Sequence, residues 1–170
     1  MDYNVPEGFT VEVDGTTLKV KGGSGEQEVK FNPRILNVKS HAGKVTIMTN
    51  RKETRKNKSA VYSIVKHLEN AVQGLTKPYE KKLEVVYAHF PISVEVKAGE
   101  VLIKNFLGEK MPRKAEIQGK AKVEAKGQAI TVTGQSKEDV GQTASNIVRA
   151  VRITKRDVRV FQDGIYYNEG

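Results

Sequence analysis

The side chains best suited to chemistry in this sequence are its cations rather than catalytic groups. The chain holds three histidines and no cysteine, so thiolate metal sites, disulfides and cysteine nucleophiles are excluded. His41, His67 and His89 lack the short spacing of a zinc site, and no serine lies in the Gly-x-Ser-x-Gly turn of a hydrolase. No motif in the sequence places two acidic side chains together as a general acid and base in one site. We therefore predict a protein that is not an enzyme and that binds no cofactor, metal or small-molecule substrate.

Lysine and arginine gather in three short segments. The chain has 29 cations and 20 acids, a formal net charge of +9, so a polyanion is the first partner to consider. The segments are residues 51–58, 104–114 and 149–159. One such run alone is compatible with a solvated face, and cations at the end of a helix also complement its macrodipole. Because the second and third segments share the second half of the chain, we predict that together they bind RNA.

The candidate RNA-binding residues come from these two segments and from the helix expected between them. Guanidinium groups bind phosphate oxygens through paired hydrogen bonds, lysines add positive charge, and neutral amides can position ribose and base edges. Phe106 can stack on an unpaired base if it is exposed, or it can fold back into the core. The candidates are Lys104, Asn105, Phe106, Lys110, Arg113, Lys114, Gln142, Asn146, Arg149, Arg152, Lys155, Arg156 and Arg159.

The elements that must position these residues occur twice along the chain. Residues 9–13 (FTVEV) align with residues 92–96 (ISVEV), and residues 64–66 (IVK) align with residues 147–149 (IVR), both at an offset of 92 − 9 = 83. In each copy, apolar residues alternate as in half-buried strands and then recur at helical spacing. The sequence therefore predicts an α+β fold of two tandem duplicated domains, each a mainly antiparallel β-sheet packed against one α-helix.

The boundary between the copies is expected near Pro78. A proline stops the first helix, and Gly74 is expected to end it as a C′ residue. We assign residues 1–79 to the first domain and residues 80–170 to the second. After its helix the second copy continues through two strand-like stretches, residues 158–161 and 164–167, that have no counterpart in the first. This basic extension makes the second domain the expected main RNA binder.

No segment is long and apolar enough to predict a membrane partner. The longest uncharged apolar stretch, near residues 85–94, is far shorter than the ~20 residues that a bilayer span needs. The N-terminus carries an acid where a signal peptide has a cation. The sequence is therefore expected to be that of a soluble, cytoplasmic protein.

Several stretches of the second copy form a specific set. They are residues 83–91 (LEVVYAHFP), 104–110 (KNFLGEK) and 139–147 (DVGQTASNI), and they resemble the large-subunit ribosomal protein of the L-six family. Residues 156–166 (RDVRVFQDGIY) are similar to the closing segment of its archaeal and eukaryotic branch. The end lacks the pattern of the bacterial branch and the chain is short for a cytosolic eukaryotic member, so an archaeal-type member is indicated.

The resemblance implies a role for the protein as well as a fold. It implies a structural constituent of the large ribosomal subunit that supports translation by binding large-subunit ribosomal RNA, mainly through its second domain. It also implies a cytoplasmic position near the stalk base and the factor-binding region, beside neighbouring ribosomal proteins. The alternative is a basic protein-interaction module that binds an acidic partner, which would keep its binding after nuclease treatment.

Overall fold

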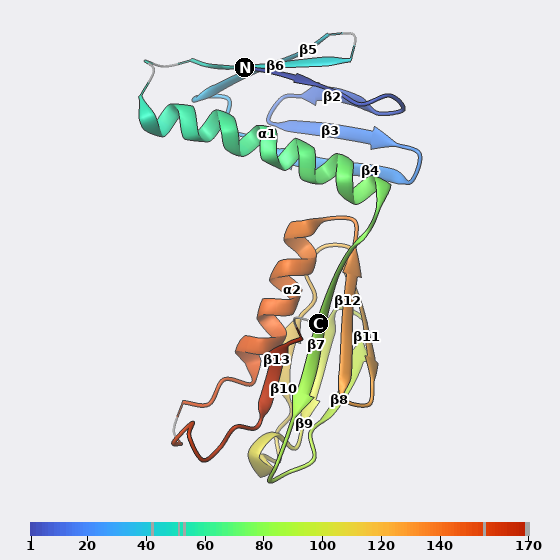
Figure 1. The fold of residues 1–170 in the computed structure, drawn as a ribbon, viewed down its shortest axis with the longest axis vertical. Helices are drawn as coiled ribbons and strands as arrows, with labels where there is room; N and C mark the ends of the chain where they lie inside the picture. Colours follow the sequence, from blue (N-terminus) through green and yellow to red (C-terminus); the bar gives the residue numbers. More distant parts are fainter. Residues whose placement is uncertain (42, 51, 53, 155, 169–170) are drawn as a thin grey trace. The chain divides into compact units, whose positions relative to one another are not determined.

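The computed structural model describes residues 1–41, 43–50, 52, 54–154 and 156–168, and Figure 1 shows its ribbon. The chain divides into two compact units, Met1–Pro78 and Tyr79–Gly170. Each unit combines antiparallel strands with one long helix, which confirms the predicted α+β fold of two tandem copies. None of the helices in the described ranges has both the length and the apolar character that crossing a membrane requires.

The first unit packs two small antiparallel sheets with one helix. Its elements are β1 (Asp2–Asn4), β2 (Thr10–Asp14), β3 (Thr17–Gly22), β4 (Gly25–Lys30), β5 (Leu36–His41), β6 (Lys44–Thr49) and α1 (Arg55–Thr76). The sheets have the strand orders β1-β6-β5 and β2-β3-β4. Alternating residues such as Leu18, Val20, Val45 and Ile47 are fully buried in the core, as the period of two along a strand requires.

Helix α1 buries one face and ends just before a proline. The Thr54 hydroxyl caps its start by accepting a hydrogen bond from the Asn57 N–H at 3.3 Å. The predicted end at Gly74 is wrong, because Gly74 is buried inside a helix that runs on to Thr76. Leu75 continues the buried face, and Lys77 adopts the extended backbone favoured for a residue that precedes a proline.

The second unit repeats this plan with additional strands. Its elements are β7 (Tyr79–Val86), β8 (Ser93–Lys97), β9 (Glu100–Lys104), the short helix η1 (Phe106–Gly108), β10 (Arg113–Glu116), β11 (Lys122–Lys126), β12 (Ala129–Gly134), α2 (Lys137–Ala150) and β13 (Gly164–Tyr167). The sheets have the strand orders β10-β9-β8 and β11-β12-β7-β13. Leu83, Ile103, Ile130 and Ile147 are central members of the buried core between these sheets and α2.

Helix α2 carries charges that match its dipole. The Ser136 hydroxyl accepts a hydrogen bond from the Asp139 N–H at 3.2 Å, and the first turn contains Glu138 and Asp139. Arg149 lies in the last turn. Acids near the start and a cation near the end of a helix each stabilise it by about 0.3–1 kcal/mol.

The basic extension contains one strand rather than two. Residues 164–167 form β13, which pairs with β7, but residues 158–160 form a turn. The Asp157 carboxylate accepts a hydrogen bond from the Arg159 N–H at 2.9 Å, and the Asp157 carbonyl accepts one from the Phe161 N–H at 3.0 Å. An aspartate that bonds to the backbone two residues later favours a turn over a strand, so the prediction for residues 158–161 is wrong.

Three connections meet at one end of the second unit. They are residues 87–92 after β7, residues 105–112 after β9, and residues 151–163 after α2. Strand pairing brings Val86 opposite Gly164, and α2 points its C-terminal end in the same direction (Figure 1). We call these three connections the loop end. The predicted basic segments 104–114 and 149–159 therefore lie largely within it.

Candidate nucleic-acid interface

Arg113 ties η1 to the end of α2. Its Nε and Nη2 donate hydrogen bonds to the Glu109 carboxylate at 2.8 and 2.7 Å. Its Nη1 donates to the carbonyl oxygens of Ala150 at 2.9 Å and Arg152 at 3.3 Å. The hydrogen bonds with Glu109 raise the pKa of Arg113 despite its partial burial. Because four of the five N–H groups of a guanidinium are used within the protein, Arg113 mainly positions the loop end.

Phe106 belongs to the core of the unit. Its side chain is 1% exposed, and the Arg113 guanidinium carbon lies 4.4 Å from the centre of its ring. A guanidinium group is attracted to the face of an aromatic ring, so this contact adds to the hydrogen bonds that hold Arg113 in place. The ring has no free face for a nucleotide, and the predicted stacking of Phe106 on an unpaired base is wrong.

Asp163 connects the 151–163 connection of the loop end to the 87–92 connection. This carboxylate is buried, and it accepts hydrogen bonds from the backbone N–H groups of Ala88 at 2.9 Å and His89 at 3.3 Å. The His89 Nδ1 lies 3.2 Å from the same carboxylate. Burial raises the pKa of Asp163, but the hydrogen bonds from the 88–90 backbone and the His89 ring outweigh burial, and the pKa is lowered overall.

Contacts between planar side chains also connect residues 156–161 to His89. The Phe161 ring centre lies 4.9 Å from that of His89, and the Arg156 guanidinium carbon lies 4.7 Å from the centre of the Phe161 ring. The positive charge of Arg156 also contributes to the lowered pKa of Glu109, after the larger effect of the hydrogen bond from Arg113. The contacts made by residues 156–163 thus orient the basic turn against the 87–92 connection.

The predicted cations divide into paired and unpaired side chains. Lys104 bonds to Glu95 at 2.6 Å, and Lys114 lies 3.5 Å from Glu100. Four other predicted cations are exposed and have no acidic partner among the residues that the structure describes, namely Lys110, Arg152 and Arg159 in the loop end and Arg149 in the last turn of α2. The predicted residue Lys155 lies outside the described residues. The unpaired cations are the side chains most available to phosphate groups.

The predicted amide side chains form hydrogen bonds within the protein. The Asn105 Nδ2 donates to the Pro91 carbonyl at 3.0 Å and links two connections of the loop end. The Gln142 Nε2 donates to the Asn146 Oδ1 at 2.9 Å, and the Asn146 Nδ2 donates to the Glu116 carbonyl at 3.0 Å. Gln142 is exposed and keeps its amide oxygen for a ligand, whereas Asn105 and Asn146 hold backbone segments in place.

Sequence reasoning did not find Asp163 or the stack around Phe161. Asp163 precedes Gly164 in the chain, a pair that by itself indicates only a turn. Its partners at residues 88 and 89 are far away in the sequence and become neighbours only when β13 pairs with β7. No local spacing carries this information.

Replacing Asp163 with Asn should destabilise the second unit at neutral pH. Asp163→Asn removes a buried charge from its N–H donors, and hydrogen bonds to charged groups contribute about 1.5–3 kcal/mol each. A lowered pKa stabilises the fold above the unfolded value of about 3.9, and this contribution is lost as the pH falls through the folded value. Urea unfolding should therefore show a loss of about 1.5–3 kcal/mol at pH 7 that shrinks below about pH 4. Glu124→Gln, at an exposed surface pair, is the control, and an equal loss at every pH would contradict the assignment.

The chain matches one protein family in both of its copies. The sequence model described as ribosomal protein L6 matches residues 5–77 and 90–164. The large ribosomal subunit protein uL6 of Methanocella arvoryzae is 45% identical over 166 residues, which cover 97% of this chain and 93% of that one. The uL6 proteins of Sulfurisphaera tokodaii and Archaeoglobus fulgidus are 43% and 45% identical, and the alignments cover 97% and 95% of this chain and 89% and 85% of theirs. These matches confirm the resemblance to an archaeal-type member.

Proposed function

Because this chain belongs to the ribosomal protein L6 family, a family of structural proteins of the large ribosomal subunit, we propose that it binds large-subunit ribosomal RNA through the loop end of its second unit. The residues proposed to contact phosphate groups are Lys110, Arg149, Arg152, Arg156 and Arg159. Lys104 and Lys114 flank them, and Arg113 and Asn105 hold the loops that present them. Gln142 is a proposed neutral contact farther along α2, beside Asn146, which donates to the Glu116 carbonyl at the end of β10.

The observation that carries this proposal is the gathering of exposed, unpaired cations on and beside the connections of the loop end. Some lysines of the first unit face acids instead, as in the pairs Lys19–Asp14 at 2.9 Å and Lys21–Glu12 at 2.7 Å. At the loop end, Lys110, Arg152 and Arg159 remain unpaired within the described residues. Like charges repel one another, so cations that gather on neighbouring connections are stabilised when phosphate groups come between them.

The proposed mechanism is electrostatic. Cations that contact phosphates displace the counterions condensed on the RNA, and the released ions make binding favourable. A rigid support lowers the entropy lost on association. Here the hydrogen bonds of Arg113 and Asp163 supply that support. Those of Arg113 connect the 105–112 and 151–163 connections, and those of Asp163 connect the 87–92 and 151–163 connections, without any RNA present.

The position in the subunit is the second part of the proposal. We place the protein near the stalk base and the factor-binding region, beside neighbouring ribosomal proteins. Membership of the family supports this position. It is independent of the loop-end proposal and is tested by assembly into large subunits rather than by binding to isolated RNA.

Salt dependence tests the electrostatic mechanism. If the five proposed cations and one flanking lysine each contact a phosphate, about six phosphates are contacted, and the affinity for large-subunit ribosomal RNA should fall by ~10³ or more between 50 and 200 mM salt. Filter binding of the full chain across this range measures the slope. An affinity that changes less than about tenfold would contradict binding through phosphates, and binding that survives nuclease treatment would indicate an acidic protein partner instead.

A further inference from the structure

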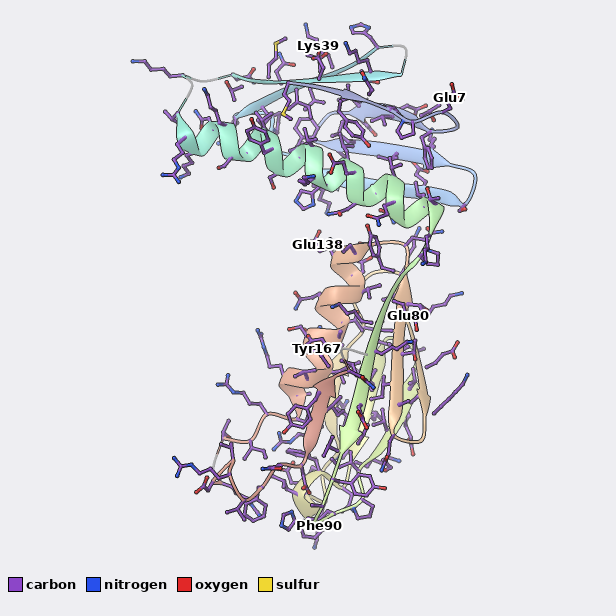
Figure 2. All side chains as sticks on the ribbon, viewed as in Figure 1. Glu7, Lys39, Glu80, Phe90, Glu138 and Tyr167 are labelled. Atoms are coloured by element: carbon purple, nitrogen blue, oxygen red, sulfur yellow. The ribbon has the colours of Figure 1, made fainter. Side chains whose placement is uncertain are left out.

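An exposed aromatic ring lies in the loop end, the part of the second unit that also carries the unpaired cations Lys110, Arg152 and Arg159. Phe90 is 38% exposed, and Figure 2 shows it at the tip of the second unit, next to η1. One side of its ring rests on Gly108, where an added Cβ would meet ring carbons at 3.3 to 3.6 Å. Gly108 has a φ of +75°, a conformation that suits glycine. Because glycine has no side chain, the Phe90 ring can pack directly against its backbone.

The backbone around Phe90 is fixed on both sides. The Asp163 carboxylate accepts hydrogen bonds from the N–H groups of Ala88 and His89. On the other side, Asn105 donates to the Pro91 carbonyl at 3.0 Å, and Ile92 is buried. A ring held in this way loses little conformational freedom when it contacts a ligand.

Cations lie in the two connections that contact residues 89 and 90. Lys110 follows Gly108 by two residues and has no acidic partner among the described residues. Arg156 lies on Phe161, whose ring faces His89, the residue before Phe90. An aromatic face next to cations matches the two parts of a nucleotide, because the base stacks on the ring while the phosphate contacts the cations.

We propose that Phe90 is the stacking platform for an unpaired base of the bound RNA, the role that the sequence suggested for Phe106. This inference rests on the proposed RNA binding at the loop end and adds a specific chemistry to it. Single-stranded or bulged RNA presents such bases, whereas a regular duplex does not. The proposed ligand feature is therefore a bulged or looped nucleotide of large-subunit ribosomal RNA.

Substitutions at Phe90 test the stacking separately from the charges. Phe90→Ala should weaken binding of the full chain to large-subunit ribosomal RNA by about 5-fold to 150-fold, as expected for one stacked base. The salt slope should not change, because no cation is lost. Phe90→Trp should retain the affinity, whereas Phe90→Leu should lose it, because leucine can pack over Gly108 but has no aromatic face on which a base can stack. Tyr62→Ala, which removes a 59% exposed aromatic from the first unit, is the matched control.

The outcomes are distinguishable from failure of the proposed function. Affinity of Phe90→Ala within twofold of the unmodified chain would overturn the stacking and leave the electrostatic binding intact. Full affinity of Phe90→Leu would also overturn it, because apolar packing alone would then suffice. Ultraviolet cross-linking of the unmodified complex should attach a nucleotide to the peptide that contains Phe90, and cross-links that avoid this peptide would contradict the proposal.

Discussion

Reversing three unpaired cations of the loop end should nearly abolish RNA binding. The triple variant Lys110→Glu, Arg152→Glu and Arg159→Glu reverses three exposed charges that form no ion pair with any residue that the structure describes. Charge-assisted hydrogen bonds contribute about 1.5–3 kcal/mol each, and each 1.4 kcal/mol is tenfold in affinity. We therefore expect at least ~10³-fold weaker binding in a gel-shift titration at fixed salt, together with a shallower salt slope.

A matched triple variant separates local contacts from net charge. Lys97, Lys120 and Lys122 lie next to the turns 97–100 and 117–121, at the other end of the second unit from the loop end. Changing all three to glutamate lowers the net charge by the same six units. Exposed charges farther away than about 8 Å are largely screened at physiological salt, so this variant should lose less than about tenfold. Equal losses from the two triples would show that overall charge governs binding.

Truncating Phe106 should lower the free energy of unfolding of the second unit by more than Asp163→Asn does. Phe106→Ala removes a fully buried ring and the surface on which Arg113 lies, and such changes cost about 3–5 kcal/mol. The loss should appear in hydrogen exchange of core amides such as those of Val101 and Ile103, and core amides of the first unit, such as those of Val45 and Ile47, should be unaffected.

The neighbouring Met111 provides the control for Phe106. Met111 is 80% exposed in the same connection, so Met111→Ala should change the free energy of unfolding by no more than about 0.5 kcal/mol. A Phe106→Ala variant that keeps its stability but loses RNA affinity would place the ring outside the core and restore the stacking role that the structure removes.

Much of the fold could be predicted because its signals are local. Alternation at Leu18 and Val20 and helical spacing at Ile64 and Leu68 specify which faces are buried, and the repeated pattern doubles each signal. The predictions were wrong where a neighbouring residue had a stronger influence on the backbone than the pattern used for the prediction. Leu75 and Pro78 set the end of α1 beyond Gly74, and Asp157 turns the chain where valine alternation predicted a strand.

The candidate site could be predicted only as a region. Clustering indicated where cations gather, but their pairing depends on strand register. Lys104 meets Glu95 only because β8 and β9 form a hairpin, and Arg113 reaches the end of α2 only through the folded core. Phe106 and Phe90 both flank polar segments in the sequence, and only packing shows that the first is buried and the second exposed.

Mapping protein–RNA cross-links in assembled large subunits tests the central claim most directly. If the loop end faces ribosomal RNA, cross-linked peptides should concentrate in residues 87–92, 105–112 and 151–163, with few at the turns 97–100 and 117–121. Cross-links that arise only from the opposite end of the second unit or from the first unit would contradict the account.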